Sequence, residues 1–155
     1  MYPHLAVSTN QVPYLDVKLL QPHAFEPEWG SERAAGMDIR CIDMCYNEEF
    51  DFIEYGTGLA VEIPEGFCGQ LVSRSSVSKT PHILCNGYGL IDSDYRGELK
   101  FRFRNVSGPK DATYYSFGDR VGQLVLVPII RPNIRVKDEL SKTVRGDGGF
   151  GSTGK

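Results

Sequence analysis

Residues 98–104 read Glu98-Leu99-Lys100-Phe101-Arg102-Phe103-Arg104, with charged and apolar residues in strict alternation. Because successive side chains of a strand point to opposite faces, Leu99, Phe101 and Phe103 share one face of such a strand. The charged residues then share the other face, which is typical of a half-buried antiparallel strand. The stretch therefore predicts a sheet that packs on a core with one face and meets water with the other.

Shorter apolar runs extend this pattern along the rest of the chain. They lie at Leu15–Leu20, Asp38–Ile42, Leu59–Ile63, Gly69–Val72 and Val121–Ile130. Glycines and prolines separate the runs, and no segment keeps a 3.6-residue apolar period for three turns, so we expect little helix. Many short strands joined by turns favour an all-β sandwich or barrel.

Length and composition exclude several classes of protein. The 155 residues correspond to one domain, and such a chain buries enough surface to fold without a disulfide or a structural metal. A formal net charge of −3 gives no basic field for a nucleic-acid backbone, so we expect no nucleic-acid partner. The sequence has neither a membrane-spanning apolar run nor a signal-peptide pattern, which predicts a cytoplasmic protein without a membrane partner.

The four cysteines form no C-x-x-C pair and lie near apolar, strand-like stretches. We interpret them as buried, reduced thiols rather than as a metal site or a disulfide framework. They are Cys41, Cys45, Cys68 and Cys85.

The end of the chain has a different composition, rich in glycine and with few large apolar side chains. We predict a single β-domain over residues 1–143 and a flexible arm over residues 144–155, because the arm cannot build a core of its own. Gly149-x-x-x-x-Gly154-Lys155 and Gly146-x-Gly148-x-x-Gly151 resemble nucleotide-binding patterns, but both patterns need a helix after them, and we reject them here. What they share is glycines whose N–H groups can wrap an anion, which favours a phosphate clamp.

Two other segments carry polar groups that suit a ligand. Ser73-Arg74-Ser75-Ser76 follows an apolar run and offers a guanidinium and hydroxyls to a phosphate, although a solvated turn is the alternative. Asn86–Gly97 contains Asp92, Asp94 and Tyr95 between glycines, and its alternative interpretation is a surface hairpin.

Taken in order, these segments resemble the five motifs of the homotrimeric dUTP pyrophosphatase (dUTPase) family. The matching segments are Ala35-Gly36-Met37-Asp38, Arg74-Ser75-Ser76, Gly89–Gly97, Gly118–Leu124 and Arg145–Gly154. Ser73 and Ser76 depart from the family's commoner proline and glycine. The resemblance implies a jelly-roll-like β-barrel that assembles as a homotrimer, with active sites shared between subunits and closed by the C-terminal arm.

The resemblance also implies the reaction, which is hydrolysis of dUTP to dUMP and pyrophosphate by in-line attack of water on the α-phosphorus. Asp92 is then the catalytic carboxylate that polarises the water. Mg²⁺ is held mainly by the substrate phosphates, and Asp38 lies near the metal-bound waters. Phosphate contacts fall to Arg74, Ser75, Ser76 and Gln123.

Base and sugar recognition is implied for the third motif and its surroundings. The residues are Asn86, Leu90, Ile91, Tyr95 and Lys100, with backbone groups reading uracil and the ring of Tyr95 against the deoxyribose. In the arm, Phe150 is expected to stack on uracil, while Arg145, Gly151, Ser152 and Thr153 meet the distal phosphates.

Two alternative functions and two local assignments stay open at this point. A dCTP deaminase shares the barrel, but it carries a catalytic glutamate where this chain has Arg102. A nucleotide-gated binding or regulatory protein could use the same fold without catalysis. Arg120 is expected to form an internal ion pair or turn rather than to bind substrate. Cys45–Tyr55 matches no motif and is expected to be a solvated loop rather than a partner surface.

Overall fold

The computed structural model describes residues 13–106 and 114–149. The regular elements of the described residues are all strands, apart from a single short 3₁₀ helix, η1 (Ser75–Lys79). The strands are β1 (Asp16–Leu19), β2 (Glu28–Trp29), β3 (Met37–Arg40), β4 (Asp43–Asn47), β5 (Phe52–Gly56), β6 (Leu59–Glu62), β7 (Phe67–Val72), β8 (His82–Leu84), β9 (Gly89–Ile91), β10 (Lys100–Asn105) and β11 (Arg120–Pro128).

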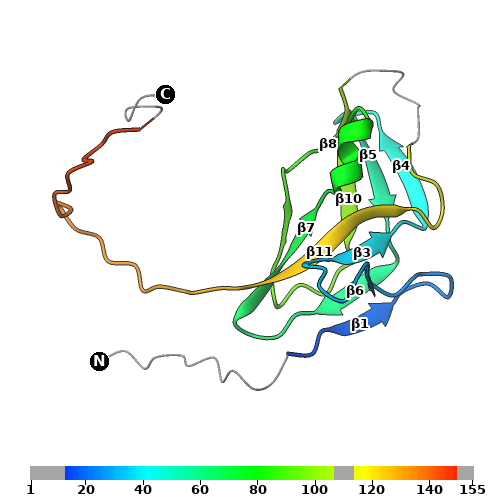
Figure 1. Cartoon of the computed structure of the whole chain (residues 1–155), viewed down its shortest axis with the longest axis horizontal. Coiled ribbons are helices and arrows are strands. Elements are labelled where there is room, and N and C mark those ends of the chain that lie inside the picture. The colour runs from blue at the N-terminus through cyan, green and yellow to red at the C-terminus, as the bar shows by residue number, and fades with distance from the viewer. Residues whose placement is uncertain (1–12, 107–113, 150–155) are drawn as a thin grey trace.

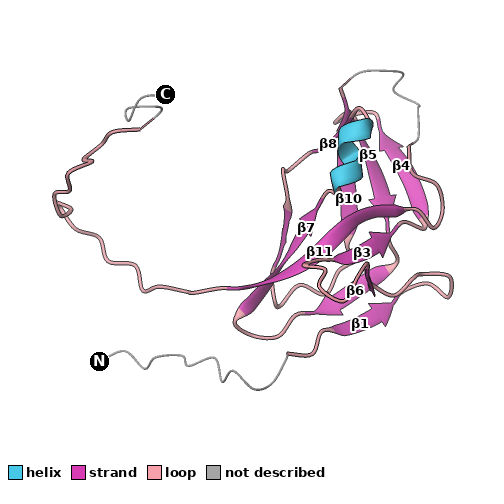
Figure 2. Ribbon diagram, viewed as in Figure 1, coloured by secondary structure: helices cyan, strands magenta, loops and turns pink. Residues whose placement is uncertain are grey.

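The strands pair in three antiparallel sheets, shown in Figures 1 and 2. Their orders are β1-β6, β4-β5-β10-β8 and β2-β3-β11-β7-β9. The predicted all-β, jelly-roll-like fold is confirmed, although backbone hydrogen bonds among the described residues do not join the sheets into one closed barrel. None of the described residues forms a helix long and apolar enough to span a bilayer.

The alternating stretch behaves as its pattern predicts. Leu99, Phe101 and Phe103 are each 0% exposed, while the charged residues of β10 face outward. Leu59 and Leu124 come from other strands into the same apolar cluster. The largest expected energy gain of the fold comes from burying these side chains, at about 25 cal/mol per Å² of apolar surface.

Two segments differ from their sequence interpretation. Cys45–Tyr55 is not a solvated loop, because β4 and β5 pair across it as a hairpin with Ile53 and Tyr55 buried. Asn86–Gly97 is not a self-paired hairpin either, since β8 pairs with β10 while β9 pairs with β7 in another sheet. In both cases the partner strand, not the local turn sequence, sets the structure.

The prediction for the cysteines is half wrong. All four thiols are free, and Cys41 and Cys68 are buried, but Cys45 and Cys85 are exposed. Burial raises the pKa of the Cys41 thiol to about 11, which keeps it protonated and unreactive. Cys45 lies in β4 on the face of the sheet that is exposed. Its place in an apolar stretch of sequence predicted a strand but did not indicate which face of that strand is buried.

Residues 129–149 leave the end of β11 and run away from the sheets (Figure 1). They contain no strand, and Ile130, Ile134 and Val136 are each more than nine-tenths exposed in the single chain. Exposed aliphatic side chains in such a row lose the free energy that burial would provide. The segment therefore presents a row of aliphatic side chains that pack against nothing in the part of the chain that the structure describes.

His82 is buried within a group of aromatic rings. Its ring stacks on Phe103 with centroids 5.3 Å apart and meets the edge of Tyr114 at 4.5 Å. Neither ring nitrogen of His82 has a hydrogen-bond partner among the described residues. Burial lowers the pKa of His82 below its ordinary value of 6.5, since the charged imidazolium would lose its hydration.

We expect the folded state to lose stability as pH falls below 6.5, because the unfolded chain then binds a proton that buried His82 resists. His82→Phe should remove this part of the pH dependence and raise stability at pH 7 by about 1–2 kcal/mol, since two unpaired nitrogens leave the core. Urea unfolding at pH 7 and pH 5.5 measures both effects. A parallel change at the exposed His23 is the control, and equal pH slopes for the parent and His82→Phe would contradict the assignment.

Candidate active site

A cavity of about 420 Å³ opens between β9, the following loop and the outward face of β10. The residues on its wall come from β9 and β10, which belong to different sheets, and from the segments next to them, and many of these residues are polar. They include Cys85, Asn86, Leu90, Ile91, Asp92, Tyr95, Glu98, Lys100 and Arg102. The third-motif residues and Lys100, which were predicted to recognise uracil and deoxyribose, therefore line one cavity, together with the predicted catalytic carboxylate.

The loop between β9 and β10 is held by its own hydrogen bonds. The backbone N–H of Tyr95 donates to the carbonyl of Asp92 at 3.1 Å, and the Tyr95 hydroxyl donates to the carbonyl of Glu98 at 3.1 Å. Gly97 has to be glycine, because a Cβ there would overlap the Tyr95 ring. These contacts fix the ring of Tyr95 at the cavity wall.

The Asp92 carboxylate is exposed and has no hydrogen-bond or ion-pair partner within residues 13–106 and 114–149. Its backbone, by contrast, is anchored through the Tyr95 N–H. A free carboxylate on a fixed backbone can accept a hydrogen bond from water, which is the arrangement that general-base chemistry needs.

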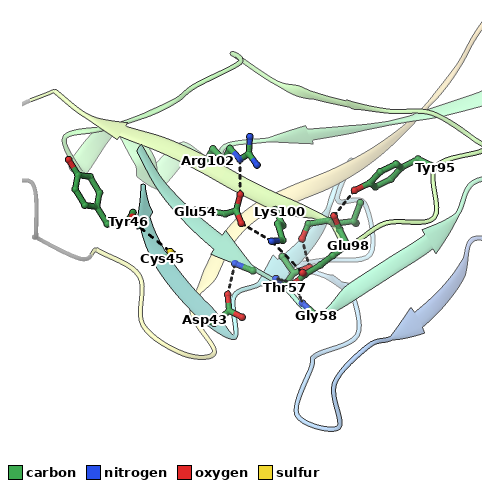
Figure 3. A network of polar contacts seen from close by, with 12 residues as sticks. Asp43, Cys45, Tyr46, Glu54, Thr57, Gly58, Tyr95, Glu98, Lys100 and Arg102 are labelled. Carbon is green, nitrogen blue, oxygen red and sulfur yellow. Dashed lines mark hydrogen bonds and ion pairs between the residues drawn. The ribbon is translucent and has the colours of Figure 1, made fainter. Parts of the chain in front are cut away.

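Glu98 joins the loop to the β5–β6 connection (Figure 3). One oxygen of its carboxylate accepts the backbone N–H groups of Thr57 at 3.0 Å and Gly58 at 2.8 Å. The Thr57 hydroxyl donates in turn to the Leu99 carbonyl at 2.6 Å. Because the Glu98 carbonyl also accepts the Tyr95 hydroxyl, a single residue ties the Tyr95 side of the cavity to the β5–β6 connection.

A second network lies on the outward face of β5 and β10, also in Figure 3. Glu54 contacts Lys100 through one carboxylate oxygen at 2.6 Å and Arg102 through the other at 2.7 Å. Although partial burial acts to raise the pKa of Glu54, hydrogen bonds from Lys100 and Arg102 outweigh it and lower that pKa. The hydrogen bond to Glu54 raises the pKa of Lys100, so both groups stay charged.

Asp38 forms the centre of a separate polar cluster. It is 4% exposed and accepts the Arg74 Nε at 3.1 Å and the Gln123 amide at 3.0 Å on one oxygen. Arg120 donates to its other oxygen at 3.1 Å. Residues of the first, second and fourth motifs thus meet at one buried carboxylate, and the expected ion pair of Arg120 is confirmed.

Sheet register explains why this cluster forms. Gln123 of β11 is paired with Asp38 of β3 on one side and with Val72 of β7 on the other. Arg74 follows the end of β7 by two residues and caps η1, so its side chain reaches back to the row that contains Asp38. Ser75 and Ser76 begin η1 and are exposed beside it.

The cavity and the Asp38 cluster do not meet within one chain. Asp92 follows Ile91 of β9, and β9 lies three strands away from β3, which carries Asp38. Along the strands, Ile91 pairs with Gly69, and Gly69 precedes by three residues the Val72 that lies in the row of Asp38. At about 4.8 Å per strand and about 3.3 Å per residue, Ile91 and Asp38 lie roughly 17 Å apart. The cavity wall includes neither Asp38, Arg74 nor Gln123.

The described residues contain no group of three or more metal-binding side chains. Asp38 has about four acceptor positions on its carboxylate, and Arg74, Gln123 and Arg120 occupy three of them. The remaining position suits a hydrogen bond from a metal-bound water better than direct coordination beside two guanidinium groups. Asp38 therefore fits an indirect contact to a Mg²⁺ ion that other ligands hold.

Sequence reasoning placed six residues at the cavity, namely Asn86, Leu90, Ile91, Asp92, Tyr95 and Lys100. It did not single out Glu54 or Glu98 as part of the site. The sequence offers only the alternation of charged and apolar residues in these two stretches, which indicates an outward-facing side chain. The strand register then shows that Glu54 lies opposite Arg102. In the arm, the Arg145 Nε donates to the Gly148 carbonyl at 2.8 Å, whereas Phe150, Gly151, Ser152 and Thr153 lie outside the described residues.

The sequence matches the dUTPase family model over residues 23–154. Among curated proteins, the deoxyuridine 5'-triphosphate nucleotidohydrolase of Escherichia phage T5 is 40% identical over 148 residues, covering 90% of this chain and 98% of the relative. The enzyme of the same name from Arabidopsis thaliana is 38% identical over 144 residues, covering 92% of this chain and 84% of the relative.

Solved structures agree in fold. A variant of the Staphylococcus bacteriophage 80alpha dUTPase with dUpNHpp superposes with a TM-score of 0.79 at 30% identity, covering 93% of this chain and all of that one. A dUTPase variant from phage phi11 of S. aureus, described for the coordination of a structural Mg(II) ion, has a TM-score of 0.69 at 32% identity and covers 82% of this chain and 98% of that one.

Proposed function

The chain belongs to the dUTPase family, and from this premise we propose that it hydrolyses dUTP to dUMP and pyrophosphate with the cavity between β9 and β10 as its base and sugar site. The observation that carries the assignment is that Asn86, Leu90, Ile91, Asp92, Tyr95 and Lys100 line this one cavity. Cellular dUTP is thereby kept out of DNA, and dUMP is supplied for dTMP synthesis.

Asp92 polarises the attacking water in this proposal. Its carboxylate has no competing partner in the part of the chain that the structure describes, and the loop that carries it is fixed by Tyr95. A positioned carboxylate of this kind contributes about 10²–10⁴-fold to the rate of a proton-transfer reaction. Water activated by Asp92 attacks the α-phosphorus in line with the pyrophosphate leaving group.

Phosphate binding falls to the Asp38 cluster. Arg74 carries positive charge, while the exposed Ser75 and Ser76 offer hydroxyls and free N–H groups at the start of η1. Gln123 is held by Asp38 with its amide carbonyl left for a further contact. Asp38 would hold a phosphate-bound Mg²⁺ indirectly, through a metal-bound water, and the ion would supply positive charge against the phosphates.

Uracil selection falls to the cavity wall around Asn86, Leu90, Ile91 and Lys100. A base that leaves one buried donor or acceptor unpaired loses about 1–3 kcal/mol for each such group, which separates uracil from cytosine. In this proposal the ring of Tyr95, whose hydroxyl donates to the Glu98 carbonyl, excludes a ribose 2′-hydroxyl. The arm residues Arg145, Phe150, Gly151, Ser152 and Thr153 complete the site by covering base and phosphates.

We propose that the protein is a homotrimer whose active sites are shared between subunits. The separation of the cavity from the Asp38 cluster in one chain supports this, because the cavity of a single copy is not lined by Asp38, Arg74 or Gln123. The exposed aliphatic residues Ile130, Ile134 and Val136 supply a segment that can pack on a neighbour. We place the enzyme in the cytoplasm.

Pyrophosphate release from dUTP, dCTP, dTTP and UTP in the presence of Mg²⁺ tests the proposal. We expect turnover of dUTP and at least about 100-fold lower kcat/KM for the other nucleotides, since each differs by a clash or an unpaired group in the cavity. Ammonia release from dCTP would instead support a deaminase. Tight dUTP binding without turnover would support a binding protein, and either result would overturn the proposed hydrolysis.

A further inference from the structure

We propose that Glu54 is a positioning residue for base binding, which holds the Arg102 guanidinium along the cavity wall and keeps this cation out of the space that uracil occupies. The inference rests on the proposed dUTP hydrolysis and concerns the same cavity. Glu54 belongs to none of the five sequence motifs and does not itself line the cavity. It acts through the side chains that do.

The geometry places Glu54 directly behind this wall. Glu54 and Arg102 are register partners on β5 and β10, so their side chains rise side by side from the outward face of the sheet. The Glu54 side chain is 18% exposed, against 55% for Arg102, which places the carboxylate beneath the guanidinium. Figure 3 shows the carboxylate between Lys100 and Arg102.

The position of the Arg102 side chain depends on Glu54 more strongly than the position of the Lys100 side chain does. Lys100 has a second carboxylate, that of Glu98, at 3.8 Å. Across the described ranges, Glu54 is the one carboxylate paired with Arg102, and the other support of the guanidinium is the Phe52 ring at 4.8 Å. Loss of the Glu54 charge therefore frees Arg102 first.

A freed guanidinium has a favourable place to go. Asp92 lies on the same cavity wall with an unpaired carboxylate, and attraction between opposite charges draws Arg102 across the opening. Uracil is neutral and cannot replace that attraction when it enters, so it has to displace the cation at a cost in binding free energy. Glu54 removes this competition by holding Arg102 against the cavity wall.

The test is Glu54→Gln, which keeps the shape of the side chain and removes its charge. We expect KM for dUTP to rise about tenfold with kcat changed less than about twofold, because the loss falls on base binding rather than on the reacting phosphorus. The Kd of dUMP, measured by calorimetry, should rise by the same factor. Glu28→Gln is the matched control. Glu28 forms a similar ion pair with Arg40, with an N–O distance of 3.1 Å, and neither residue lines the cavity.

A double variant separates positioning from a structural role. In Glu54→Gln/Arg102→Gln the free cation is absent, so KM should return to within about threefold of the parent value while any loss of thermal stability persists. An unchanged KM in Glu54→Gln, or a raised KM that the double variant does not restore, would overturn the inference alone. A parent protein that neither releases pyrophosphate from dUTP nor binds dUMP would overturn the proposed function as well.

Discussion

Asp92→Asn is expected to lower kcat for dUTP hydrolysis by about 10³–10⁴-fold, because asparagine cannot take the proton of the attacking water. The substitution keeps the volume of the side chain. It also leaves untouched the hydrogen bond from the Tyr95 N–H, which goes to the backbone carbonyl of residue 92. The loop should therefore keep its form, and the loss should appear in the chemical step.

Binding measurements separate this effect from damage to the cavity. The Kd of dUMP for Asp92→Asn should stay within about threefold of the parent value, since the base and sugar contacts come from other residues. Asp94→Asn is the control, because Asp94 lies in the same turn but is not on the cavity wall. A kcat for Asp92→Asn within tenfold of the parent would rule out Asp92 as the carboxylate that activates water.

Local patterns predicted the parts of this molecule that depend on local chemistry. The alternation in residues 98–104 gave β10 and its buried face because a strand's two faces are set by position alone. The order of five motifs pointed to Asp38, Arg74 and Gln123, and the structure brings these three side chains together. Each motif by itself had an ordinary turn or ion pair as its alternative.

Strand register accounts for what sequence reasoning missed. Glu54 and Arg102 are 48 residues apart, and nothing in either local sequence indicates that they are register partners. The same limit explains the error over Cys45–Tyr55, where four acidic residues suggested a solvated loop. Those residues occupy the turn and the outward face of a hairpin whose inner residues, Ile53 and Tyr55, are buried.

The proposed division of the site between subunits leads to the second large effect. Asp38→Asn replaces the carboxylate that accepts hydrogen bonds from Arg74, Arg120 and Gln123 by an amide that can accept fewer. Two guanidinium groups then lie beside a buried neutral side chain, and we expect a loss of about 2–3 kcal/mol in the free energy of unfolding. This loss is smaller than the loss from breaking a fully buried ion pair, because both arginines are partly exposed. We also expect kcat/KM for dUTP to fall about 100-fold or more, since Arg74 loses its orientation toward the phosphates.

Coexpression of Asp38→Asn with Asp92→Asn chains tests whether the site is shared. Each variant alone should be nearly inactive. In every mixed trimer, one of the three sites takes residue 92 from an Asp38→Asn chain and residue 38 from an Asp92→Asn chain, and this site receives both native carboxylates. Pyrophosphate release should therefore recover to about a third of the parent rate in mixed trimers isolated through two affinity tags. If both carboxylates came from the same chain, every site would carry one defect and no activity would return, which would refute the division of the active site between subunits.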